Sequence, residues 1–173
     1  IFLRGIIEFS GHCRRNCHYC GLRAANRDVR RYRMTDDEIL LRAGMLGEKR
    51  CTTVVLQSGE DPFYDTERMC SIIRRVRNET SLAITLSIGE RPFEDYEAFR
   101  EAGADRYLLR HETSSPELYR ALHPGHELAG RVACLENLRQ LGYEVGSGCI
   151  VGLPGQTADV LAEDVLLIRD LDI

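Results

Sequence analysis

Short apolar runs alternate along the chain with longer segments of helical periodicity, and this pairing occurs five times. The runs are rich in β-branched residues and show little polar alternation, which is typical of parallel strands covered on both faces. They predict strands over residues 3–9, 53–57, 83–87, 106–110 and 144–151. The periodic segments predict helices over residues 35–47, 66–78, 93–102, 128–141 and 158–171.

Residues at the ends of these segments support the helix boundaries. Thr35 and Glu38 have the spacing of a capping box, in which each side chain satisfies a backbone amide at the start of a helix. Pro116 follows a serine and is placed for the first turn of another helix. Gly103 and Gly142 are placed as C-terminal caps just before the next strand.

Strand–helix alternation of this kind predicts an α/β fold with a parallel sheet and right-handed crossovers. Five units fit either a barrel wall or a doubly wound sheet. A doubly wound sheet normally has a glycine-rich phosphate-binding turn after its first strand. Here that position holds a cysteine-rich loop, so we predict a partial TIM-like barrel with about five β/α units.

Composition and charge exclude several classes of protein. The 173 residues fit a single domain, and a net charge of −4 gives no basic field for nucleic acid. The local pairs Arg14-Arg15 and Arg30-Arg31 are interpreted as solvated faces. No apolar run approaches the roughly 18 residues of a membrane helix, so we expect no membrane partner. Seven cysteines, an odd number and mostly scattered, indicate a reducing cytoplasm rather than a disulfide framework.

Three of the cysteines, Cys13, Cys17 and Cys20, are spaced C-x3-C-x2-C directly after the first predicted strand. Thiolates gathered in this way select iron–sulfur clusters, zinc or Cu(I). A 4Fe-4S cluster normally takes four cysteines, so three would leave one iron open to a ligand from outside the protein.

A structural zinc site is the alternative for these three thiols, with a histidine as fourth ligand. Such sites usually pair two short ligand hairpins, and no second hairpin is visible in the sequence. The spacing therefore favours iron–sulfur over zinc. The candidate fourth zinc ligands are His12, His18 and His111, and the isolated cysteines are Cys51, Cys70, Cys134 and Cys149.

Ligands of parallel barrels bind at the carboxyl ends of the strands, and polar residues follow several of the apolar runs. Gln57 and Ser58 come first after strand two. Gly59 would let the backbone approach a ligand closely, and Glu60 offers a carboxylate to an ammonium group, although a simple turn also fits. Thr85 would face the cavity from strand three if its side of the strand points inward.

Charged and glycine-rich residues mark the ends of strands four and five. Arg110 and Glu112 need partners after an apolar strand, and these are either a ligand or each other. The pattern alone leaves Arg131 on a solvated helix face. Glycines in strand five indicate close approach of a ligand, and the strand runs into the segment Gly152, Leu153 and Pro154.

The cysteine spacing, with Tyr19 before the last cysteine, resembles the signature of radical S-adenosylmethionine (SAM) enzymes. This resemblance implies a (β/α)6 barrel, a 4Fe-4S cluster and SAM, whose methionyl part caps the open iron. It implies reductive cleavage of SAM to methionine and a 5′-deoxyadenosyl radical. The segment Gln57 to Glu60 resembles the family's "GGE" motif, which binds the SAM amino group, with Ser58 in place of the first glycine.

The resemblance also implies roles for the remaining candidates. Glu112 would face SAM near its ribose or methionyl end, and Arg131 would pair with the SAM carboxylate. Arg110 would face the substrate cavity. The segment 152–154 would border the adenine, and Tyr19 and Thr85 complete the expected cofactor contacts.

Other segments resemble the HydE-type maturases of FeFe-hydrogenase, within the subgroup of biotin synthase and methylornithine synthase. These are the stretches 20–23, 31–35, 57–61, 110–113 and 152–157. The resemblance implies an oxygen-sensitive enzyme that helps to build the hydrogenase di-iron cofactor. Its expected partners are a small-molecule or iron–cysteine substrate, a ferredoxin- or flavodoxin-type electron donor and other hydrogenase maturases. The other two subgroup activities and a zinc-binding structural module are the alternatives. We expect residues 1–173 to be a radical SAM core domain truncated at both ends, without the sixth strand and C-terminal segment.

Overall fold

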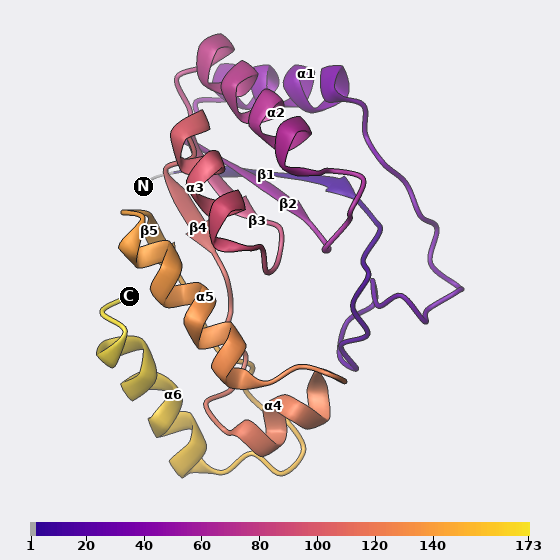
Figure 1. Ribbon diagram of the computed structural model, residues 1–173. Coiled ribbons are helices and arrows are strands. Elements are labelled where there is room, and N and C mark those ends of the chain that lie inside the picture. Colours follow the sequence, from indigo (N-terminus) through magenta and orange to yellow (C-terminus); the bar gives the residue numbers. More distant parts are fainter. Residues whose placement is uncertain (1–2) are drawn as a thin grey trace.

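A computed structural model describes residues 3–173 and contains one sheet of five parallel strands (Figure 1). Their order in the sheet, β1-β2-β3-β4-β5, is their order along the chain. Each crossover therefore steps to the next strand in the same direction, which builds a barrel wall, whereas a doubly wound sheet reverses direction. The predicted partial TIM-like barrel is confirmed. The strands are β1 Arg4–Ser10, β2 Thr53–Ser58, β3 Ala83–Ser87, β4 Arg106–Leu108 and β5 Glu144–Gly146.

Helices connect the strands, and the capping signals in the sequence are confirmed. Thr35 and Glu38 form both hydrogen bonds of the capping box, Pro116 opens a helix, and Gly103 ends one with a left-handed backbone. None of the helices within residues 3–173 is long and apolar enough to cross a membrane. They are α1 Asp36–Glu48, α2 Thr66–Glu79, α3 Phe93–Ala102, α4 Pro116–Leu122, α5 Leu128–Gln140 and α6 Ala158–Asp170.

The hydrophobic core lies between the sheet and helices α1, α2, α3 and α5 (Figure 1). Alternate residues of the strands point to this side, so Leu56 of β2 and Leu86 of β3 are fully buried. Tyr107 of β4 contacts the rings of Tyr96 and Tyr143 edge to face, with centroids 5.1 and 5.9 Å away. This packed layer fixes the strand directions and hence the position of the strand ends.

The opposite face of the sheet is covered less than the sequence pattern predicted. Exposed and buried residues alternate along β1, and Ile6 on this face is 60% exposed. Farther along, Glu8, Gln57 and Ser87 line a cavity. The expectation of two covered faces holds in the middle of the sheet, where Val55 and Thr85 on this face are 7% and 5% exposed. It was wrong for the β1 edge and the carboxyl ends of the strands, which turn toward solvent and a cavity.

Strands β4 and β5 end earlier than predicted, at Leu108 and Gly146. One further backbone bond follows, from Leu109 N to Gly146 O at 2.9 Å. The side chain of Ser147 then replaces the next backbone acceptor, since its Oγ accepts from His111 N at 3.2 Å. The two segments meet again at an isolated bridge between Glu112 and Cys149. A polar side chain therefore interrupts the ladder that the apolar run predicted.

Candidate active site

A cavity of 480 Å³ opens at the carboxyl ends of the strands, where the barrel fold places its ligand sites. Loops after β1, β2, β3 and β4 contribute to its wall, together with residues of α4 and α5. The predicted residues that line it are Cys13, Cys17, Tyr19, Cys20, Gln57, Ser58, Gly59, Glu60, Arg110, Glu112 and Arg131. The predicted residues that are not among its lining are Thr85, Gly152, Leu153 and Pro154.

The loop between β1 and α1 carries the three cysteines and extends past the tip of β1 (Figure 1). Its two ends pair with each other, through bonds from Gly11 N to Tyr32 O and from Met34 N to Phe9 O. The Arg31 guanidinium shapes the rest of the loop by donating to four backbone carbonyls at 2.6 to 3.0 Å, those of Gly11, Leu22, Arg23 and Asn26. Interpreting Arg31 as part of a solvated face was therefore wrong.

The thiols of Cys13, Cys17 and Cys20 are free, half-buried and face the same cavity. Burial raises the pKa of Cys17, and the neighbouring Cys13 and Cys20 raise it further. A bound metal would offset the repulsion between these thiols, because thiols bind metals as thiolates and the metal supplies positive charge. The arrangement thus fits a metal cluster.

The three thiols do not have the spacing of a tetrahedral zinc site. With Zn–S bonds of about 2.3 Å, the sulfur ligands would lie roughly 3.8 Å apart. Within residues 3–173, the cysteine triplet does not form a group whose ligand atoms all lie within 4.8 Å. Of the candidate fourth ligands, His111 is fully buried outside the cavity lining. His111 therefore does not complete a zinc site with this triplet among the described residues.

Gly59 brings the end of β2 into direct contact with the cysteine loop. A Cβ atom at this position would lie 2.5 Å from both Cys13 Cβ and His12 O, so only glycine fits. The neighbouring backbone adds a hydrogen bond of 2.9 Å from Arg14 N to Glu60 O. Gly59 thus lets the first cysteine of the loop pack against the end of β2. A simple turn, the alternative that the sequence allowed for this segment, would not require that contact.

Four charged side chains form a continuous network, of which Arg15, Glu60 and Arg131 line the cavity and Glu90 joins the two arginines. Arg15 donates to Glu60 Oε2 and to Glu90 Oε2, both at 2.6 Å. Arg131 donates from Nε to Glu90 Oε1 at 2.6 Å and also contacts the Arg110 carbonyl. Arg131 is 9% exposed. It is therefore a buried cavity residue and not the solvated residue that its helical pattern alone indicated.

The electrostatics of this network favour the charged forms of Glu90 and Arg131. Burial alone would raise the pKa of Glu90, but Arg131 and Arg15 outweigh it, so that pKa lies below its ordinary value. Burial alone would lower the pKa of Arg131, but Tyr119 and Glu90 raise it overall. Arg131 can thus present a fixed positive charge to an anionic ligand group.

Sequence reasoning missed Arg15 and Glu90. A signal for Glu90 was present, because Gly89-Glu90 follows β3 as Gly59-Glu60 follows β2. Gly89 has a φ of +77°, and a Cβ there would lie 2.3 Å from the Glu60 side chain. The two Gly-Glu pairs therefore pack against each other at adjacent strand ends. Arg15 carried no comparable signal, because its two partners follow different strands.

Glu112 holds an unusual conformation at the opposite wall, with a φ of +69° and 7% exposure. Its Oε1 accepts from the Tyr19 hydroxyl at 3.0 Å, and that hydroxyl also lies 3.1 Å from His123 Nε2. Its buried Oε2 has no hydrogen-bond partner among the described residues. Burial raises the pKa of Glu112, whereas it lowers that of His123 to about 4.

An unpaired carboxylate oxygen in a cavity is costly unless a ligand donates to it. The Glu112 oxygen therefore fits a ligand that carries hydroxyl or ammonium donors. Together with the three thiols and the buried Arg131 charge, it supplies complementary contacts for a zwitterionic cofactor that also carries hydroxyls. The residues present thus fit both groups that the family resemblance implies, a 4Fe-4S cluster and SAM.

Comparison with known proteins agrees with this geometry. Residues 7–168 match the family described as the radical SAM superfamily. The chain is 50% identical to the [FeFe] hydrogenase maturase subunit HydE of Thermotoga maritima, over 99% of the chain and 49% of that protein. It is 34% identical to 3-methylornithine synthase of Methanosarcina barkeri, over 88% of the chain and 44% of that protein.

A solved structure supports the same relationship. The crystal structure of methylornithine synthase (PylB) superimposes with a TM-score of 0.93 at 31% identity, covering 99% of this chain and 51% of that one. The chain thus spans about half the length of the relatives that it matches.

Proposed function

The chain belongs to the radical SAM superfamily, and on that premise we propose that Cys13, Cys17 and Cys20 hold a 4Fe-4S cluster that binds SAM at its open iron. Cluster and SAM together supply the reductive cleavage that yields methionine and a 5′-deoxyadenosyl radical. The observation that carries this proposal is the meeting of three free thiols, the unpaired Glu112 oxygen and the Arg131 charge in one cavity.

The residues around the thiols would orient SAM. Arg131 has the planar, bidentate geometry that suits a carboxylate, and Glu90 holds its Nε in place. The free Glu112 oxygen would accept from the ribose or methionyl end. Glu60 already accepts from Arg14, Arg15 and Glu90 N, so it uses three of about four acceptor positions and retains one for an ammonium donor.

Such positioning converts the reaction into an effectively unimolecular one. Tyr19 contributes by fixing the Glu112 carboxylate through its hydroxyl. Arg110 is exposed on the cavity wall and would contact the substrate beyond SAM. Thr85 and the segment 152–154 remain proposed cofactor contacts, although they are not among the cavity-lining residues.

We further propose that the protein acts in FeFe-hydrogenase maturation, as the name of its HydE relative suggests. The substrate would be a small molecule or an iron–cysteine complex, and the electron donor a ferredoxin or flavodoxin. Other maturases would be partners, and a reducing compartment would protect the cluster. A methylornithine synthase-type activity is the second candidate, because that enzyme shares the fold closely.

Anaerobic reconstitution with iron and sulfide tests the proposed chemistry. The protein should take up about four irons and, with dithionite and SAM, release 5′-deoxyadenosine measurable by liquid chromatography. Cys17→Ala should lose both properties. Cys51→Ala is the matched control, because Cys51 lies outside the cavity lining, and it should keep both. Retained SAM cleavage by the Cys17→Ala protein would contradict the proposal.

A complementation assay separates the two candidate substrates. In cells that lack the HydE-type maturase, the wild-type gene should restore hydrogenase activity. Arg110→Ala should restore less than one tenth of it while its purified protein still cleaves SAM, because Arg110 would contact the substrate and not the cofactor. Failure of the wild-type gene, together with formation of 3-methylornithine by the purified protein, would favour the second candidate.

A further inference from the structure

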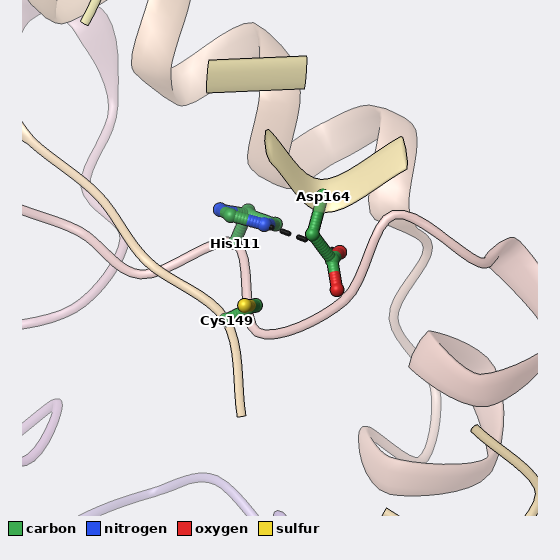
Figure 2. A group of neighbouring side chains, drawn as sticks. All are labelled: His111, Cys149 and Asp164. Carbon is green, nitrogen blue, oxygen red and sulfur yellow. Dashed lines mark ion pairs between the residues drawn. The ribbon is translucent and has the colours of Figure 1, made fainter. Parts of the chain in front are cut away.

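A second group of metal-ligating side chains lies outside the cavity lining. His111, Cys149 and Asp164 each place one ligand atom within 4.8 Å of the others (Figure 2). His111 follows β4, Cys149 follows β5, and Asp164 belongs to α6. None of the three lines the cavity that contains the cysteine loop. Three separate parts of the chain therefore converge on one point that the proposed radical SAM chemistry does not use.

Asp164 reverses the usual pattern of a helix that packs on a protein core. It is the buried residue of α6, with 0% exposure, whereas the adjacent Val165 and Leu166 are 66% and 44% exposed. Aspartate is rarely fully buried unless its charge is paired or coordinates a metal. The position of Asp164 thus calls for a compensating charge.

The structure leaves two buried polar atoms of this group unsatisfied. His111 Nε2 and Asp164 Oδ2 have no hydrogen-bond partner among residues 3–173, and both residues have 0% exposure. His111 Nε2 lies 3.3 Å from Asp164 Oδ1, an ion-pair contact without a hydrogen bond. Figure 2 marks this ion pair with a dashed line. Buried polar atoms without a hydrogen-bond partner call for an explanation, and an ion bound between them and the neighbouring thiol supplies one.

Neighbouring groups already orient the three side chains. His111 Nδ1 lies 3.0 Å from Ser147 Oγ, so Nε2 is the ring nitrogen that faces Asp164. The backbone N–H of Ser114 donates to Asp164 Oδ1. Cys149 is held because Glu112 pairs with the residues on both sides of it, Gly148 and Ile150. Such outer contacts are typical of metal ligands, whose orientation they fix.

We propose that His111, Cys149 and Asp164 form a second metal site that binds a single Zn²⁺ ion. Imidazole nitrogen, thiolate sulfur and carboxylate oxygen are each ligands that zinc binds in proteins. A thiolate and a carboxylate also balance the charge of the ion, which leaves the buried group neutral. Cys149 is half-buried, so solvent can reach the ion from its side and supply a fourth ligand.

The ion would hold α6 against the segments that follow β4 and β5. His111 directly precedes Glu112, so the site would also fix the backbone that places the Glu112 carboxylate in the cavity. This inference goes beyond the proposed function and does not depend on it.

Zinc analysis by X-ray absorption tests the proposal. The anaerobically purified protein is loaded with Zn²⁺, passed over a chelating resin and analysed for metal. We expect about one zinc per chain and a coordination shell of one sulfur with nitrogen and oxygen neighbours. A zinc ion in the cysteine loop would instead show three sulfurs. That shell, or zinc below one tenth per chain, would overturn the proposal.

Variants locate the ion. In competition with a chromophoric chelator, Cys149→Ser should weaken Zn²⁺ binding at least 100-fold, and Ser147→Ala should weaken it about tenfold through loss of the His111 contact. Cys51→Ser is the control for loss of an unrelated thiol and should bind Zn²⁺ as the wild type does. Unchanged affinity in a folded Cys149→Ser protein would contradict the site. If that variant does not fold, the sulfur count of the wild-type absorption spectrum still decides.

Discussion

The two parts of the sheet are built differently. Strands β1, β2 and β3 are five to seven residues long and pair along their length, whereas β4 and β5 have three residues each. The first part is held by apolar side chains that alternate into the core. Beyond β4 and β5, polar side chains such as Ser147 and an isolated bridge hold the backbone.

This difference separates the sources of stability and of chemistry. Burial of apolar area is the main favourable term in folding, and the first part of the sheet supplies much of it. Beyond the short strands β4 and β5, the backbone adopts conformations that continued strand pairing would not allow. One of them is the positive φ of Glu112. Such conformations persist where the surroundings over-determine them, and they concentrate at functional sites.

The largest effect should follow a cavity in the first part of the sheet. Leu86 of β3 is fully buried, so Leu86→Ala should lower the free energy of unfolding by about 3 kcal/mol. Leu108→Ala removes the same atoms from β4, where the side chain is half-buried on the cavity wall, and should cost less than half as much. Urea denaturation measures both. Equal losses would contradict the division of the sheet.

Replacing Arg131 should affect the second part through ligand binding. Arg131→Ala should weaken SAM binding by tenfold to 100-fold, about 1.4 to 2.7 kcal/mol, because a charge-assisted contact is lost. Arg131→Lys keeps the charge without the planar fork and should fall between the wild type and alanine. Equilibrium binding by calorimetry gives the three affinities. Equal affinities would remove Arg131 from the SAM site.

Acid should weaken the anchor that joins the cysteine loop to β2. Asp61 is 1% exposed and forms a bidentate ion pair with Arg33, at 2.7 and 2.9 Å. Burial alone would raise the pKa of Asp61, but Arg33 and Ser10 lower it to about 2 from an ordinary 3.8. The folded-state pKa is depressed, so this stabilisation is present above pH 3.8 and is lost as the pH falls toward 2.

The depressed pKa corresponds to about 2 kcal/mol of stability. Asp61→Asn should therefore lower stability at neutral pH and flatten its pH dependence between about pH 4 and pH 2. Denaturation at several pH values compares the two proteins. A wild-type stability that does not fall in this window would show that the Arg33 pair contributes little.

The smallest effect should come from relieving the backbone at Glu112. Glu112→Gly should raise stability without ligands by about 1 kcal/mol, since glycine adopts a positive φ without strain. The same variant should bind SAM more weakly. Glu112→Gln retains the strained backbone and should show no such gain. Thermal unfolding compares the three proteins, and a less stable glycine variant would mean that the Tyr19 contact outweighs the strain.

The sequence predicted most of the first part of the sheet and the elements that carry the site. Apolar runs and capping residues located the strands and helices, and the cysteine spacing located the loop. The polar residues that followed strands two and four line the cavity as expected. These features are local, so they can be read without knowing the tertiary contacts.

The remaining features depend on contacts distant in sequence. The sequence pattern indicates solvated side chains for Arg15 and Arg31, because their partners are not adjacent to them in the chain. Arg15 binds the carboxylate of Glu60, and Arg31 binds backbone carbonyls such as that of Gly11. Thr85 and Ser87 lie on the same face of β3, because they are two residues apart. Only Ser87, nearer the carboxyl end of the strand, lines the cavity. The early ends of β4 and β5 reflect the Ser147 contact with the backbone at His111, which an apolar run cannot reveal.

Electron paramagnetic resonance of the reduced protein, with and without SAM, tests the central proposal most directly. Anaerobically reconstituted protein should give the signal of a reduced 4Fe-4S cluster at about one spin per chain, and SAM should shift its g values because the open iron gains a ligand. Folded protein that holds no iron, or a cluster signal that SAM leaves unchanged, would contradict a three-cysteine cluster with a vacant iron.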